Sequence, residues 1–161
     1  MSEVAQIRNV MLEELEHGVI TTQRLIQLIK ESDWEFQPKG NMRTVVELVY
    51  HLVSIPATDL AILQEKSGDE VNQIEQELEG IKDAAKLSEI MQKNYEQLKA
   101  YMNSLSDDDF LNKATKAFYS DHAALQMKWL MEITTHTYHH RAQLFNYLKE
   151  LEYDINFFIL Y

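Results

Sequence analysis

The sequence predicts an all-α fold, a four-helix bundle that forms a single domain over residues 1–161. Three observations support this prediction. The chain contains only four Gly and two Pro, which is few for a fold with many tight turns. Apolar residues make up 45% of it, enough material for one core. These residues recur at three- and four-residue steps over long stretches, the spacing of amphipathic helices.

The first two helices have recognisable limits. Helical spacing of apolar residues predicts the first helix over about residues 4–30, and it should end before Pro38. Thr44 and Glu47 stand three residues apart and match a capping box, so the second helix is expected to begin there. Its apolar stripe runs from Val45 to Ile55.

A polar segment separates the second and third helices. Residues 64–86 are mostly polar and acidic, which favours a long, partly helical crossover. The third helix is expected over about residues 84–105, with a short turn at 106–109. The stretch 113–119 has no regular pattern and is expected to be irregular.

The last helix is expected to begin at Ser120 or Asp121, either of which can act as an N-cap, and to end near Leu151. The tail over residues 155–161 is strongly apolar. It should therefore pack on the bundle or on a second subunit. A homodimer is the expected assembly.

The charge of the chain disfavours two classes of partner. The formal net charge is -11 at pH 7, which would repel a nucleic-acid backbone and an anionic membrane surface. No apolar run approaches the roughly 20 residues that a membrane helix needs. The amino terminus lacks the basic start and apolar stretch of an export signal. We therefore expect a cytoplasmic protein that binds neither nucleic acid nor membrane.

A cluster of histidines is the most informative feature. Three of the six His lie between residues 136 and 140. On a helix His136 and His140 share one face, whereas His139 is turned by roughly 100° from His140. The pair continues an apolar stripe through Ile133 and Leu144 and should face the core. Two buried imidazoles need polar partners, and a shared divalent cation is one of the few partners that satisfies both.

His51 is the candidate for a third ligand, because it lies on the inner side of the second helix. The chain has no Cys, so a metal must bind nitrogen or oxygen. Three His leave a coordination position open, as in catalytic zinc sites. Zinc or nickel is favoured, and iron, cobalt or manganese would also suit. The alternative is that His136 and His140 are surface or singly hydrogen-bonded side chains. That is also the expectation for His17, His122 and His139.

Four other residues are candidate neighbours of the site, and no catalytic residue is assigned. Asp59 and Glu132 could accept a hydrogen bond from a ligand N–H. Arg141 could steer an anionic substrate, although an ordinary salt bridge to an acidic residue is favoured. Trp129 could line a pocket, although packing is the simpler explanation.

The segment from His136 to Leu144, HTYHHRAQL, resembles the HxxHHRxQL signature of the DinB family. The segments Trp34–Pro38 and Thr44–His51 resemble the family as well, and the likeness is lost after Leu148. The resemblance implies a four-helix bundle with a three-His metal site. It also implies bacillithiol- or mycothiol-dependent transferase or isomerase chemistry, with the ligands at His51, His136 and His140.

Three functions compete, and an enzyme is favoured. The first is a metal-dependent thiol S-transferase that acts on small electrophiles in detoxification or stress, with a low-molecular-weight thiol as co-substrate. A metal-dependent hydrolase ranks second, because the sequence shows no obvious base such as the Glu of an HExxH motif. The third is a non-enzymatic bundle that binds metal or another protein.

Overall fold

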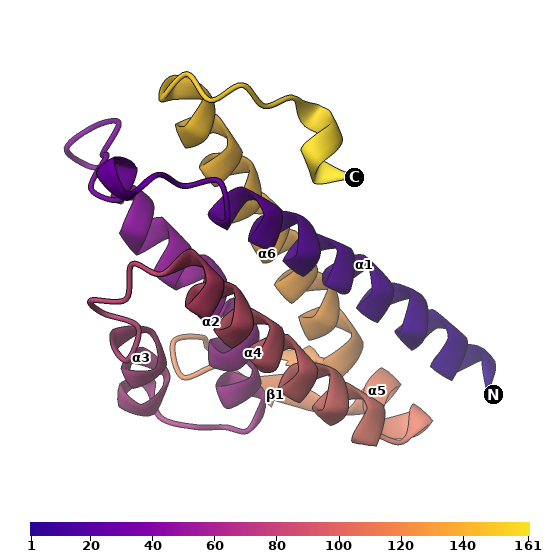
Figure 1. The fold of residues 1–161 in the computed structure, drawn as a ribbon. Coiled ribbons are helices and arrows are strands. Elements are labelled where there is room, and N and C mark those ends of the chain that lie inside the picture. Colours follow the sequence, from indigo (N-terminus) through magenta and orange to yellow (C-terminus); the bar gives the residue numbers. More distant parts are fainter.

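Four long helices form the body of the computed structural model, which describes residues 1–161 (Figure 1). They are α1 (Glu3–Ile26), α2 (Val45–Leu63), α4 (Ala84–Ser104) and α6 (Gln126–Glu150). The shorter elements are η1 (Glu31–Asp33), α3 (Gly68–Gln76), α5 (Asp107–Asn112), β1 (Ala114–Lys116), β2 (Ala123–Leu125) and η2 (Phe157–Leu160). The predicted all-α bundle with a long crossover between its second and third long helices is confirmed.

Side-chain caps set the starts of α2 and α3. Thr44 accepts a hydrogen bond from the N–H of Glu47, whose carboxylate accepts one from the N–H of Thr44 at 2.7 Å. The predicted capping box is therefore present. Ser67 and Glu70 form a second one at the start of α3, and caps of this kind typically contribute about 1 kcal/mol each. Helix α2 continues through Pro56 to Leu63.

Helix α2 lies at the centre of the bundle, where it contacts α3, α4 and α6. By length and composition it could cross a bilayer, but 72% of its most apolar window is buried inside the structure. The neighbouring helices therefore account for its apolar composition. The 34 buried apolar residues of the protein form one core cluster.

A small hairpin replaces the irregular stretch expected before the last helix. Strands β1 and β2 pair antiparallel, and α6 begins directly after β2 at Gln126. The prediction of an N-cap at Ser120 or Asp121 was wrong. Ser120 instead accepts a hydrogen bond from the N–H of His122 inside the hairpin turn. Buried Gln126 donates to Thr115 Oγ1 at 2.9 Å and ties the start of α6 to β1.

The carboxyl-terminal tail returns to α1 (Figure 1). His17 Nε2 lies 2.9 Å from the carbonyl oxygen of Leu160, and Arg24 donates to the carbonyl of Tyr161 at 2.6 Å. The tail thus packs on the bundle, as one of the two expected arrangements. The rings of Phe157 and Phe158 nevertheless remain 58% and 70% exposed.

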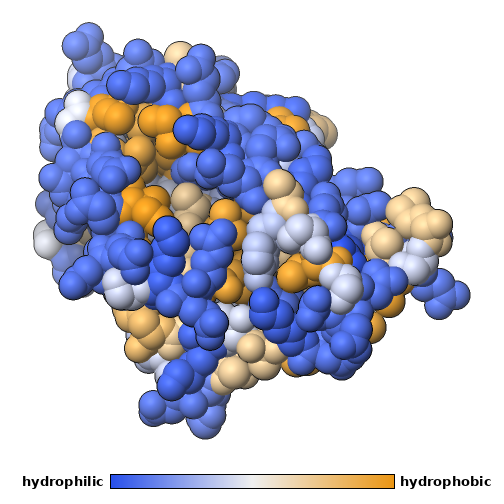
Figure 2. Space-filling model, turned by 90° about the horizontal axis from the view of Figure 1, so that it is seen from below, coloured by the Kyte–Doolittle hydropathy of each residue, from blue (hydrophilic) through white to orange (hydrophobic).

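The surface is mostly hydrophilic on the face that Figure 2 shows. Seen from the end of the molecule below the view of Figure 1, hydrophilic residues dominate and apolar residues appear in separate patches (Figure 2). Charged residues make up 25% of the sequence, and acidic residues outnumber basic ones by 26 to 15.

Candidate metal centre

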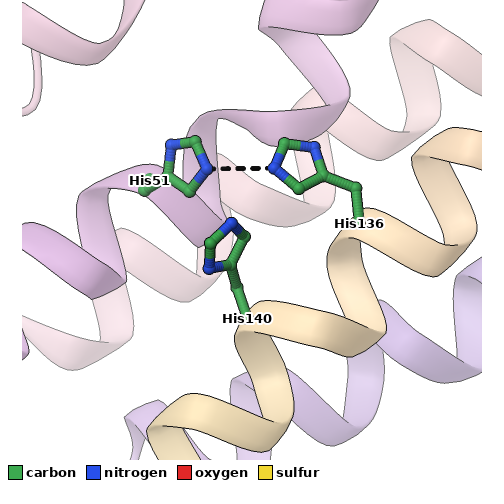
Figure 3. A group of neighbouring side chains, drawn as sticks. All are labelled: His51, His136 and His140. Atoms are coloured by element: carbon green, nitrogen blue, oxygen red, sulfur yellow. Dashed lines mark hydrogen bonds between the residues drawn. The ribbon is translucent and has the colours of Figure 1, made fainter.

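Helices α2 and α6 bring three histidines together. His51 lies on α2, while His136 and His140 lie one turn apart on α6. One nitrogen from each of the three rings lies within 4.8 Å of the corresponding nitrogens of the other two. The Nε2 atoms of His51 and His136 are 3.1 Å apart. Figure 3 shows the three rings gathered between the two helices.

The opposite nitrogen of each ring faces an oxygen acceptor. His51 Nδ1 lies 3.1 Å from a carboxylate oxygen of Glu75, and His140 Nδ1 lies 2.7 Å from Oε1 of Gln143. His136 Nδ1 lies 3.8 Å from Oδ2 of Asp59, which is longer than a hydrogen bond. At His51 and His140 these acceptors favour neutral imidazoles with the proton on Nδ1, leaving a lone pair on Nε2. The lone pair on His51 Nε2 then faces His136 Nε2, where either a ring proton of His136 or a shared cation satisfies it.

The donor set fits a transition-metal ion. Two nitrogens that bind one zinc ion at about 2.0–2.1 Å with tetrahedral angles are roughly 3.3–3.4 Å apart, close to the 3.1 Å between His51 and His136. Imidazole suits zinc, nickel, cobalt and iron almost equally, so these distances do not select one metal. The three residues present can therefore hold such an ion.

Burial keeps the site in the protonation state that binds metal. His140 is only 8% exposed, and burial lowers its pKa to about 4. Its ring is therefore neutral near pH 7, with a lone pair available. The hydrogen bond from His51 lowers the pKa of Glu75. That carboxyl therefore stays ionised and accepts the Nδ1 proton of His51.

The centre opens into a cavity of about 610 Å³. His51 and His136 line one wall, while α3 and the turn between β1 and β2 supply others, including Phe118 and Tyr119. Small-molecule sites commonly measure about 300–1,000 Å³. The cavity is therefore large enough for a substrate beside the histidines.

Only one of the four expected neighbours of the site, Asp59, lines the cavity beside the histidines. Exposed Glu132 instead pairs with Lys128 at 3.3 Å. Trp129 donates to the carbonyl of Thr115 at 3.1 Å and packs against β1. Neither Glu132 nor Trp129 lines the cavity.

Arg141 requires a correction. Its guanidinium donates to Thr21 Oγ1 at 2.7 Å and lies 4.0 Å from the centre of the Tyr138 ring. It also lies within 3.5 Å of the carbonyl of Leu160. One residue along a helix turns by about 100°, so Arg141 faces α1 while His140 faces α2. It neither lines the cavity nor forms the acidic salt bridge that the sequence favoured.

Two neighbours of the histidines were missed from the sequence. Gln143 follows His140 by three residues, and helical spacing alone could have identified it. Glu75 lies 24 residues from His51, in the polar crossover, and no local pattern connects the two. None of the other histidines belongs to the group of three. His122 and His139 are exposed as expected, although the His139 ring packs against that of His140 with centroids 4.7 Å apart, and His17 contacts the tail.

A comparison with known protein families assigns the chain to one of them. The sequence profile of the DinB superfamily matches residues 14–144. The chain belongs to the DinB superfamily. No curated protein matches it.

Several solved DinB structures share the fold. A putative DinB family member from Exiguobacterium sibiricum 255-15 is 26% identical, with a TM-score of 0.76 and 97% of each chain covered. The DinB-like protein YjoA from Bacillus subtilis is 17% identical, with a TM-score of 0.68 and coverage of 90% of this chain and 94% of that one. At 17% identity the second likeness concerns the fold alone.

A third structure bears on the expected absence of a nucleic-acid partner. The colibactin self-resistance protein ClbS, solved in complex with double-stranded DNA, is 15% identical with a TM-score of 0.63. The match covers 88% of this chain and 95% of that one. A protein of this fold thus binds DNA, so fold offers no argument against such a partner. For this DinB protein the argument rests on its net charge of -11.

Proposed function

We propose that this DinB protein is a divalent-metal-dependent thiol S-transferase that acts on small electrophiles in detoxification or stress. One observation carries the proposal. His51, His136 and His140 direct nitrogens toward a common point, and two of them line a substrate-sized cavity. Zinc or nickel is the proposed metal, with iron, cobalt or manganese as further candidates.

The residues around the centre have distinct tasks in this proposal. His51, His136 and His140 would hold the ion, which when bound supplies a Lewis acid that lowers the pKa of a thiol. Glu75 and Gln143 hold two of the rings in position through their Nδ1 atoms.

The thiol proton passes to solvent water in the cavity. As that S–H bond breaks, the sulfur forms a bond to the electrophilic carbon, and the leaving group departs with its electron pair.

A conjugation assay tests the proposal. Protein loaded with zinc or nickel should consume a low-molecular-weight thiol in the presence of an aryl chloride faster than metal-free protein does, and should yield the thioether. The His140→Ala variant should fall to the metal-free rate, whereas His122→Ala, in the exposed hairpin turn, should keep the full rate. The absence of conjugation with every bacterial thiol and electrophile tried would contradict the proposal.

Metal-dependent hydrolysis is the second candidate, because Asp59, which the sequence suggested only as a hydrogen-bond acceptor for a ligand N–H, lies in the cavity wall. Its carboxylate accepts no hydrogen bond within the protein and could take a proton from an attacking water. Turnover of an ester or amide without any thiol would favour this candidate. A protein that only binds metal would not need the cavity beside His51 and His136.

Glu75 offers a separate test of the metal centre. Glu75→Ala removes the acceptor of the His51 Nδ1 proton, and losses of this kind lower metal affinity by roughly 10- to 100-fold. Competition with a chromogenic chelator would measure the affinity for zinc. Glu77→Ala, an exposed substitution of equal charge at the end of α3, should leave it unchanged. Equal affinities in both variants would show that Glu75 does not support the site.

We also propose a cytoplasmic homodimer that takes a small-molecule substrate. The exposed rings of Phe157 and Phe158 in the tail support a contact with a second subunit. The lack of Cys is compatible with a reducing compartment. Light scattering of the purified protein would measure its mass in solution.

A further inference from the structure

The cavity beside the histidines has a one-sided charge. Its lining includes four carboxylate residues, Glu47, Asp59, Glu75 and Glu79, and no Lys or Arg. Two of the four are already engaged. Glu75 faces Nδ1 of His51, and Glu47 caps α2 through Thr44. The carboxylates of Asp59 and Glu79 accept no hydrogen bond within the protein, so both are free to bind a ligand.

Asp59 is the more buried of these two free carboxylates. It is only 8% exposed, yet no N–H or O–H of the protein donates to it. Its Oδ2 lies 3.8 Å from Nδ1 of His136, beyond hydrogen-bond distance. A largely buried carboxylate without a protein donor is costly in free energy unless water or a ligand supplies one. Its open side faces the cavity, so a ligand there can supply the missing donor.

Aromatic rings form another part of the wall. Tyr50, Phe118 and Tyr119 line the cavity, and the last two rings meet edge to face with centroids 5.1 Å apart. The faces of aromatic rings attract organic cations, including ammonium groups. Carboxylates and aromatic rings in one cavity therefore favour a cationic ligand that also has an apolar part.

The basic side chains near the cavity do not reverse this preference. Lys82 forms an ion pair with Glu35. Arg43 lies in an adjacent hollow that it shares with Glu47 and Glu75, and it does not line the main cavity. Without a bound metal ion, a carboxylate or phosphate inside the cavity would thus meet no Lys or Arg in its lining.

We propose that the cavity selects a substrate that carries a protonated amine, with Asp59 as its principal partner. The inference deepens the proposed function, on which it rests: one of the two reactants of the S-transferase, the thiol or the electrophile, carries the ammonium group. Binding of the ammonium group itself needs neither metal nor reaction, so it can be tested separately.

Three probes of similar size isolate the effect of ligand charge on binding. Metal-free protein is titrated at pH 7 with benzylammonium, benzyl alcohol and benzoate, and binding is followed through amide shifts in ¹H–¹⁵N NMR spectra. Benzylammonium should bind about tenfold more tightly than benzyl alcohol, since a hydrogen bond to a charged group typically contributes that much. Benzoate should not bind. The shifted amides should include those of Asp59 and Tyr119.

Substitutions then assign the preference to the cavity. Asp59→Asn keeps the size of the side chain and should reduce the binding of benzylammonium to the level of benzyl alcohol. Glu89→Gln changes the net charge equally on the exposed face of α4 and should have no effect. Glu79→Gln, which is exposed and not expected to disturb folding, should weaken benzylammonium binding severalfold.

The outcomes separate this inference from the proposed function. Equal binding of all three probes, tighter binding of benzoate, or full benzylammonium affinity in Asp59→Asn would overturn the ammonium site. Selective benzylammonium binding without any thiol conjugation by the metal-loaded protein would retain the site and reject the transferase. Thiol conjugation by a protein that binds all three probes equally would retain the transferase and reject the ammonium site.

Discussion

His140→Ala is expected to lower the affinity for zinc by roughly 100- to 1,000-fold. A four-ligand zinc site contributes about 10–16 kcal/mol, so one ligand is worth about 2.5–4 kcal/mol. His140 is buried, and Gln143 holds its ring through Nδ1 at 2.7 Å, so the substitution removes a ligand that the protein already holds in position. Elemental analysis after gel filtration would measure the metal retained by each protein.

The adjacent residue provides a matched control for this experiment. His139 is exposed, and although its ring packs beside that of His140 with centroids 4.7 Å apart, it supplies no nitrogen to the group of three, so His139→Ala should retain the metal content of the unsubstituted protein. Each variant loses one imidazole from the same turn of α6, and only the direction of the ring differs. Equal metal content in His140→Ala and the unsubstituted protein would remove His140 from the site.

Arg8→Ala is expected to lower the free energy of unfolding by about 3 kcal/mol. The Arg8 guanidinium is buried and donates to the carbonyls of Met102 and Leu105, at 3.0 and 2.8 Å, where α4 ends. It also donates to Asp107 at 3.0 Å and lies 4.8 Å from the centre of the Phe110 ring. Removing one partner of such a buried charged network typically costs about 3–5 kcal/mol, and the partial exposure of Asp107 lowers this estimate.

Equilibrium urea unfolding followed by circular dichroism would measure this loss. A change of about 3 kcal/mol corresponds to a fall in melting temperature of roughly 6–12 °C for a domain of this size. Arg24, on the same helix, is exposed, and its replacement by alanine should cost less than about 1 kcal/mol. An equal, small loss in both variants would show that Arg8 does not stabilise the junction of α4 and α5.

Most of the fold followed from local patterns. Periodic apolar residues identified the four long helices, and the capping box located the start of α2 at Thr44. The hairpin before α6 escaped prediction because each strand has only three residues, too few for a period of two to appear. The start of α6 was misplaced for a related reason. Ser120 has the chemistry of an N-cap, but it bonds within the hairpin turn.

In the candidate site, too, local spacing identified some residues and missed those that only the packing of helices brings together. His136 and His140 lie on one helical face, so spacing could pair them, and His51 was identified by its position on an apolar stripe. Glu75 belongs to α3, and only the packing of α3 on α2 brings it to His51. Arg141 shows the opposite error, because sequence adjacency to His140 suggested a proximity that helical rotation removes.

The separation of the histidines along the chain has a consequence for folding. His51 and His136 are 85 residues apart and belong to different helices. An ion held by both would act as a removable cross-link that the unfolded chain cannot form. Its binding would therefore shift the equilibrium toward the native state by an amount that grows with free metal concentration. Cells that limit such ions would thereby also limit how long this bundle survives proteolysis.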